Sequence, residues 1–167
     1  YARKHGHSFW NLADAMACAT SLGFAFGRLA NFVNGELWGR VSDVKWAVVF
    51  PQELGLTYGE YTAAAIGPLV ASGELMARHP SQLYQAFCEG FLVFGIMLLL
   101  RKTAFAKRPG ALSACYLALY ALARIAMEFF REPDNGQFFI GWMSKGQFYS
   151  LLLILGAGYI CWKQKLL

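Results

Sequence analysis

The chain has 167 residues, of which 57% are hydrophobic, 16% aromatic and 15% charged, and its formal net charge is +5. Soluble domains carry about 25% charged residues, so this composition excludes an ordinary soluble domain and indicates a membrane protein. The basic residues form no dense run, which argues against a nucleic-acid-binding surface. The four cysteines lie apart in apolar runs without metal-ligand spacing, so we expect reduced cysteines, no metal and no cofactor.

Four stretches are mostly apolar and close to the length of about 20 residues that a helix needs to cross a bilayer. They are residues 14–33, 83–100, 111–130 and 147–162. The predicted fold class is therefore an all-α integral membrane protein with four transmembrane helices in a single membrane domain, residues 1–167. The chain begins with Tyr1 and shows no signal-peptide pattern, so we expect it to be part of a longer protein.

The charges in the connections predict the orientation of these spans. Basic residues without acidic neighbours flank one set of span ends: Arg3, Lys4, Arg101, Lys102, Lys107, Arg108, Lys163 and Lys165. The other two connections, residues 34–82 and 131–146, mix both signs. Under the positive-inside rule, both ends of the chain face the cytoplasm and the two mixed connections face outward.

The connection of residues 34–82 is too long for a simple loop. Residues 46–50 have the pattern of a short strand that Pro51 stops, and residues 61–75 are apolar and rich in alanine. We expect a small outward-facing head, or an amphipathic arm that lies on the membrane.

Charged residues inside the predicted spans are the main functional signal, because each costs at least about 2.5–3.5 kcal/mol at the centre of a membrane helix. In the first span, Arg28 and Asn31 share a helix face, Asn34-Gly35 ends the helix, and Glu36 follows. An arginine there can hold a phosphate or carboxylate with two hydrogen bonds. The alternative is a helix C-cap with one structural ion pair.

A second polar stripe lies on the third span. Tyr120, Arg124, Glu128 and Arg131 are spaced by four, four and three residues, which puts them on one helix face. Arg124 and Glu128 form either an internal ion pair or part of a site for an anionic head group. Glu89 in the second span pairs with Arg28 or with Arg124, and the sequence does not choose between them. Asp14 is expected to cap its own helix.

Three runs of residues resemble those of one known family, the prolipoprotein diacylglyceryl transferases. The longest is similar to the family signature: Gly27-Arg28-x-x-Asn31-Phe32-x-Asn34-x-Glu36-x-x-Gly39. Two more match in order and spacing: Pro80-Ser81-Gln82-Leu83-Tyr84-Gln85 and Tyr120-x3-Arg124-x3-Glu128-Phe-Phe-Arg131-x-Pro133-Asp134. Residues 1–6 resemble the cytoplasmic loop of the family, so the resemblance covers essentially the whole chain.

The resemblance implies a bacterial inner-membrane protein of about seven spans, of which the four here are the C-terminal ones. Residues 34–82 would form the periplasmic head, and the active site would lie toward the periplasm. The implied activity transfers the diacylglyceryl group of phosphatidylglycerol to the lipobox cysteine of a prolipoprotein, forming a thioether and releasing glycerol 1-phosphate. It implies no metal, cofactor or nucleic acid, and we expect a monomer.

The resemblance also implies the site residues. The catalytic set is Arg28, Asn31, Glu36, Tyr120, Arg124 and Glu128, and the phosphatidylglycerol-binding set is Arg28, Asn34, Gly39, Arg124 and Arg131. The two shared arginines would bind the phosphate. Glu36 and Glu128 would orient the arginines or hydrogen-bond the glycerol, and either of them could assist proton removal. Two alternatives stay open. A transporter fragment would contain two related halves, but no repeat is apparent; a non-catalytic membrane partner would carry these charges for structural reasons.

Overall fold

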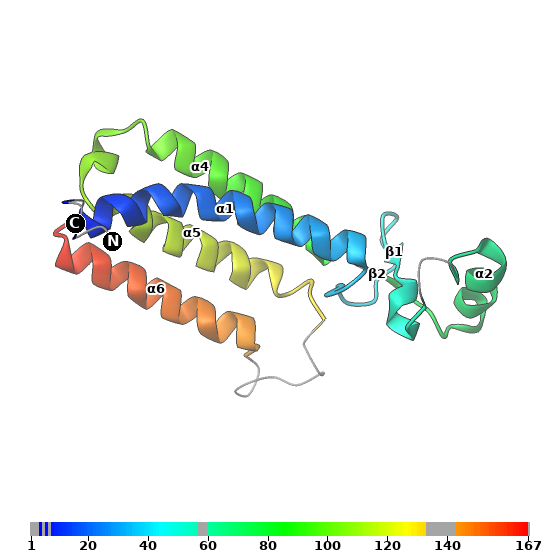
Figure 1. The fold of residues 1–167 in the computed structure, drawn as a ribbon. Helices are drawn as coiled ribbons and strands as arrows, with labels where there is room; N and C mark the ends of the chain where they lie inside the picture. The colour runs from blue at the N-terminus through cyan, green and yellow to red at the C-terminus, as the bar shows by residue number, and fades with distance from the viewer. Residues whose placement is uncertain (1–3, 5, 7, 57–59, 133–142, 167) are drawn as a thin grey trace.

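The computed structural model describes residues 4, 6, 8–56, 60–132 and 143–166. Its main body is a bundle of long helical segments that lie side by side (Figure 1). These are α1 (Phe9–Asn34), a continuous helical segment from Ser81 to Leu100, α5 (Ala111–Met127) and α6 (Lys145–Lys163). The Ser81–Leu100 segment consists of α3 (Ser81–Gln85), a π-helical stretch (Ala86–Leu92) and α4 (Val93–Leu100). α6 packs along α5, and α1 packs against the π-helical stretch and α5.

The predicted helices are confirmed, and their membrane crossing is supported most directly for one of them. Among the described residues, the helical segment Ser81–Leu100 is long and apolar enough to span a bilayer. Ala111–Met127 and Ala63–Ser72 are apolar but shorter, while α1 and α6 are longer and less apolar. The four-span arrangement therefore stays a prediction. Most of the second predicted outward connection, together with Pro133 and Asp134, lies outside the described residues.

The first helix ends where the Asn34-Gly35 pair predicts. Gly35 adopts a left-handed conformation with φ of 65°, and its N–H donates to the carbonyl of Phe32 at 3.1 Å. The N–H of Glu36 donates to the carbonyl of Asn31 at 3.0 Å. These two bonds form a Schellman motif, which satisfies the last carbonyls of α1 and turns the chain into the head.

The head lies at the end of the bundle opposite to both chain termini (Figure 1). Its sheet pairs β1 (Val48–Val49) with β2 (Ala77–Arg78) in antiparallel register, so the strand expected over residues 46–50 is confirmed over two residues. A 3-10 helix (Pro51–Leu54) follows directly. The projecting helix α2 (Ala63–Ser72) has no buried side chain (Figure 1).

Arg78 fastens the head to the bundle. Its guanidinium pairs with Glu53 in the head and lies 3.5 Å from Glu132, which follows α5. The hydrogen bonds to Glu53 raise the pKa of Arg78 above its ordinary value. The head is therefore held to the bundle by charge-assisted contacts near the end of α5.

At the terminal end of the bundle, Asp14 corrects one expectation. Its carboxylate accepts hydrogen bonds from the N–H of Gly110 at 2.8 Å, the N–H of Ser113 at 2.8 Å and the hydroxyl of Ser113 at 2.6 Å. Asp14 therefore caps α5, not its own helix. The first turn of α5 offers N–H groups that lack partners within the helix, together with the positive end of its dipole, and both favour a carboxylate.

Candidate functional site

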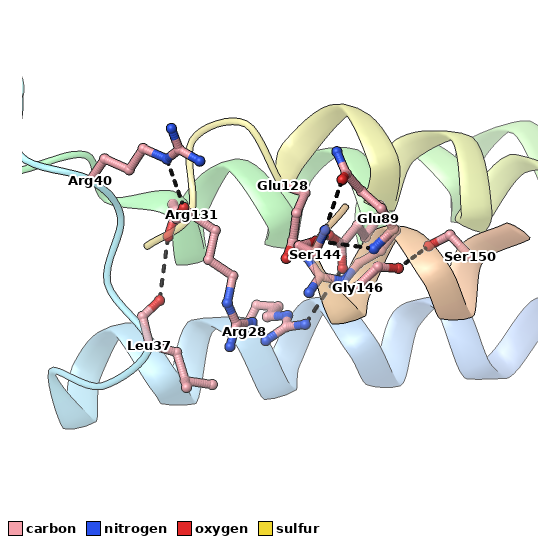
Figure 2. A network of polar contacts seen from close by, with 12 residues as sticks. Arg28, Leu37, Arg40, Glu89, Glu128, Arg131, Ser144, Gly146 and Ser150 are labelled. Carbon is pink, nitrogen blue, oxygen red and sulfur yellow. Dashed lines mark hydrogen bonds and ion pairs between the residues drawn. The ribbon is translucent and has the colours of Figure 1, made fainter. Parts of the chain in front are cut away.

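Four charged side chains from three helical segments meet inside the bundle. Glu89 on the π-helical stretch is fully buried, with 0% of its side chain exposed. One of its carboxylate oxygens lies 3.7 Å from Nη2 of Arg28 on α1, and the other lies 3.7 Å from Nη1 of Arg124 on α5 (Figure 2). Arg124 also pairs with Glu128, one turn further along α5. The open question about Glu89 is thus answered: it pairs with both arginines. These four residues are called the arginine cluster below.

The π-helical stretch positions Glu89 because it lies close against α1. A Cβ atom added to Gly90 would lie 2.5 Å from the Cβ of Ala25, so only glycine allows the two backbones to approach this closely. Arg28 follows Ala25 by one helical turn and therefore reaches Glu89. π-Helical turns are rare and occur frequently at functional sites.

The start of α6 completes the arginine cluster. The hydroxyl of Ser144, the N-cap of α6, donates to Oε1 of Glu128 at 2.8 Å. A Cβ on Gly146 would lie 2.7 Å from Nη2 of Arg124 and 2.7 Å from Oε2 of Glu128, so the helix rests directly on this ion pair. Sequence reasoning missed both residues. The available signal was the capping box formed by Ser144 and Gln147.

Polar residues on α3 extend the polar interior toward the head. Gln82 and Gln85 are fully buried on α3, directly before the π-helical stretch that carries the buried Glu89. The amide of Gln82 donates to the backbone carbonyl of Glu36 at 2.8 Å. Both amide atoms of Gln85 are buried without a hydrogen-bond partner among the described residues. The sequence analysis included these glutamines only in a run that resembles the family and did not assign them to the site.

Arg131 and Gly39 meet where the chain enters the head. The two residues form an antiparallel bridge, and the Arg131 carbonyl accepts a bond from Nε of Arg40 at 3.1 Å. A Cβ on Gly39 would lie 2.5 Å from the carbonyl oxygens of His79 and Phe130, which explains the need for glycine there. Figure 2 shows the buried Arg131 side chain extending toward Arg28.

The arginine cluster contains two guanidinium groups and two carboxylates, and the side chain of Arg131 lies near it. Both ion pairs to Glu89 are longer than a hydrogen bond, and the buried Nε of Arg28 has no hydrogen-bond partner among the described residues. Such an arrangement suits an anion with several oxygen atoms, because each guanidinium carries five N–H donors.

A groove on α1 leads to Arg28. This cavity has a volume of about 470 Å³ and is lined by Thr20, Gly23, Phe24, Gly27, Arg28 and Asn31. Gly23 and Gly27 leave the groove wide, since a Cβ on either would meet nothing within 4 Å. The ring of Phe24 packs on Tyr120 at a centroid distance of 4.8 Å. An apolar groove thus runs beside the arginine cluster.

The predicted residues are divided between two places. Arg28, Tyr120, Arg124, Glu128 and Arg131 lie in or beside the arginine cluster, and Asn31 lines the groove with Arg28. Asn34, the last residue of α1, and Glu36 are both exposed, and the Asn34 amide donates to the Glu36 carboxylate at 3.3 Å. Among the described residues, neither side chain forms an ion pair with a member of the arginine cluster.

Comparison with known proteins gives a consistent result. The model of a family described as prolipoprotein diacylglyceryl transferase matches residues 1–163. A phosphatidylglycerol–prolipoprotein diacylglyceryl transferase of Allorhizobium ampelinum is 41% identical over 168 residues, which cover 99% of this chain and 52% of that protein. A protein of the same name from Brucella anthropi is 40% identical over 169 residues, covering 98% of the chain and 52% of the relative. The chain thus spans about half the length of these relatives.

Proposed function

Because the chain belongs to the prolipoprotein diacylglyceryl transferase family, we propose that it carries the phosphate-binding half of an enzyme of that activity. The enzyme transfers the diacylglyceryl group of phosphatidylglycerol to the lipobox cysteine of a prolipoprotein. The observation that supports this most is the arginine cluster, which combines buried guanidinium groups, N–H donors without a hydrogen-bond partner among the described residues and an adjoining apolar groove.

The proposal includes the position of the protein in the membrane. The four long helical segments cross the bacterial inner membrane, with both chain termini in the cytoplasm and residues 34–82 as a periplasmic head. Basic residues at one end of the bundle support this orientation. A lipid then enters sideways from the bilayer, so that its acyl chains lie along the groove of α1 and its phosphate meets Arg28.

The chemistry follows from the charge that develops in the reaction. The cysteine thiolate attacks the glycerol carbon that bears the phosphoester, a C–S bond forms, and the C–O bond to the phosphate breaks. Glycerol 1-phosphate leaves with the bonding electrons, and its growing negative charge is stabilised by Arg28 and Arg124. Glu89 keeps the two guanidinium groups apart and oriented, because each of its oxygens faces one of them.

The remaining predicted residues receive roles in the same proposal. Glu128, held by Ser144 and Arg124, orients Arg124 or accepts the thiol proton. Tyr120 and Asn31 contact the glycerol head group beside Arg28. Asn34 and Glu36 contact the substrate from the mouth of the site, where their side chains are exposed. Arg131 attracts the anionic lipid, and its bridge to Gly39 fixes the backbone there.

Arg124→Lys tests this function in the full-length protein. Lysine keeps the charge but loses the planar fork that binds phosphate with two bonds. In phosphatidylglycerol vesicles with a lipobox peptide, the mass of the diacylglyceryl adduct reports transfer. We expect the variant to fold and to lose about 10²–10³-fold in rate.

Arg108→Lys is the matched control, because Arg108 binds the Leu166 carbonyl at the other end of the bundle. It should keep the rate of the unmodified protein. Near-normal transfer by Arg124→Lys would instead mean that Arg124 only balances Glu128 and that Arg28 is the main phosphate ligand. Absence of any adduct with the unmodified full-length protein would contradict the proposed activity itself.

A further inference from the structure

A second cavity with charged lining residues lies near the start of α1 and shares no lining residue with the arginine cluster. Figure 1 shows that α1 starts at the end of the bundle that carries both chain termini. The cavity has a volume of about 380 Å³ and lies between the first turns of α1 and the connection from α4 to α5. Its charged lining residues are Asp14, Arg101, Lys102 and Lys107. The proposed transfer reaction uses none of them.

Positive charges outnumber negative charges in the lining of this cavity. The carboxylate of Asp14 is buried and is occupied by its three hydrogen bonds to Gly110 and Ser113, so it faces the start of α5. Within the described ranges, the side chains of Arg101, Lys102 and Lys107 have no carboxylate within ion-pair distance. Three exposed cations therefore surround one carboxylate that is already satisfied.

The wall of the cavity is apolar below this charged rim. Cys18 and Leu112 are buried and belong to the core shared by α1, α4 and α5, and Ala106 packs against that core. The hydroxyl of Thr103 donates to the Leu100 carbonyl at 2.7 Å, which fixes the turn that carries Arg101 and Lys102. A charged rim over an apolar wall matches an amphiphile better than a free ion.

We propose that this cavity binds the phosphate-bearing head group of an anionic phospholipid from the leaflet at that end of the bundle. The site is separate from the proposed substrate site. Basic pockets between membrane helices recognise anionic head groups by charge. Arg101, Lys102 and Lys107 would surround the phosphate, while the start of an acyl chain would follow the apolar wall past Leu112.

The test uses full-length protein in detergent micelles and dioleoyl phosphatidate, whose binding is titrated by native mass spectrometry. The variant pair Arg101→Gln with Lys107→Gln removes two charges from the cavity. The matched pair Lys163→Gln with Lys165→Gln removes two charges from the same end of the bundle but outside the cavity. Each cation near a membrane surface contributes about 1 kcal/mol, so the cavity pair should weaken one bound phosphatidate about 10–30-fold.

The matched pair should change that affinity less than about threefold, and both pairs should retain their melting temperature and transfer activity. A phosphatidate molecule that binds at the arginine cluster would still bind in both double variants, and the mass spectra count it as a second bound lipid. Equal weakening by both pairs would overturn the proposal, since the charges would then act only as a surface field. Equal affinity for dioleoyl phosphatidylcholine, or displacement by inorganic phosphate, would also overturn it. If the double variant does not fold, Lys102→Gln alone should still weaken binding about fivefold.

Discussion

Two buried carboxylates in different parts of the bundle are held in very different ways. Asp14 accepts three short hydrogen bonds from the first turn of α5. Glu89 has no hydrogen bond to either oxygen among the described residues, and each oxygen faces an arginine at 3.7 Å. A carboxylate with a purely structural role can be fully satisfied within the protein. The looser contacts of Glu89 leave arginine N–H groups available to a ligand.

The comparison is tested most strongly by Glu89→Gln. Removing one partner from a buried ionic cluster leaves uncompensated charge and costs about 3–5 kcal/mol of stability. If Arg28 and Arg124 face a phosphate site, phosphatidylglycerol will supply part of the missing negative charge. The melting temperature of the full-length variant, followed by tryptophan fluorescence in detergent, should therefore fall and then recover partly when phosphatidylglycerol is added.

Phosphatidylcholine serves as the control lipid for Glu89→Gln and should restore much less stability. The transfer rate at saturating lipid should also fall, because the two guanidinium groups lose the charge between them. Equal recovery with both lipids would mean that the arginines do not face an anion site. In that case the arginine cluster would be a structural lock between α1, α5 and the π-helical stretch.

Gly146→Ala tests the contact between α6 and the ion pair. The added methyl group would lie 2.7 Å from both Arg124 and Glu128, and overpacking of this kind costs about 1–3 kcal/mol. The variant should lose stability and transfer activity together, because the pair must shift to accommodate it. Gly158→Ala on the same helix is the control, since a Cβ there meets nothing within 4 Å. It should be neutral or slightly stabilising, as alanine is the better helix former.

Asp14→Asn tests the structural end of the bundle. Asparagine replaces one acceptor oxygen by an N–H donor, which then faces an N–H group of Gly110 or Ser113. An unsatisfied buried group costs about 1–3 kcal/mol, so chemical or thermal unfolding should show a loss in that range. Transfer activity per folded molecule should stay unchanged, and added phosphatidylglycerol should restore no more stability than it adds to the unmodified protein. Specific rescue by this lipid would remove the proposed difference between the two carboxylates.

The sequence predicts the helices and the local stripes of this protein well. Apolar stretches of sufficient length give the four long helical segments, and Asn34-Gly35 gives the end of α1. Spacing alone puts Arg124 and Glu128 on one face of α5. These features depend on residues that are near one another in the chain, so a single sequence contains the necessary information.

Contacts between distant segments could not be predicted in the same way. The partners of Glu89 and Asp14 depend on how helices pack, and many packings bury the same helix faces. Gly146 matters because its backbone lies close to Arg124 and Glu128, and this contact exists only when α6 packs against α5. The head gives a second example. The sequence predicts a strand over residues 46–50, but only the two residues that pair with β2 form a strand.

The smallest expected effect comes from comparing two N-cap serines. Ser144 accepts a bond from the N–H of Gln147 and donates to Glu128, whereas Ser8, the N-cap of α1, makes no side-chain capping bond. Loss of a working N-cap costs about 0.5–2 kcal/mol, so Ser144→Ala should be destabilised by that amount and Ser8→Ala hardly at all. Ser144→Ala should also slow transfer several-fold, because Glu128 loses the hydroxyl that fixes its orientation. Steady-state kinetics and thermal unfolding of the folded variant separate the two effects. A fall in kcat with unchanged stability would show that Ser144 orients Glu128. A loss of stability with an unchanged kcat would show that Ser144 acts only as a helix cap.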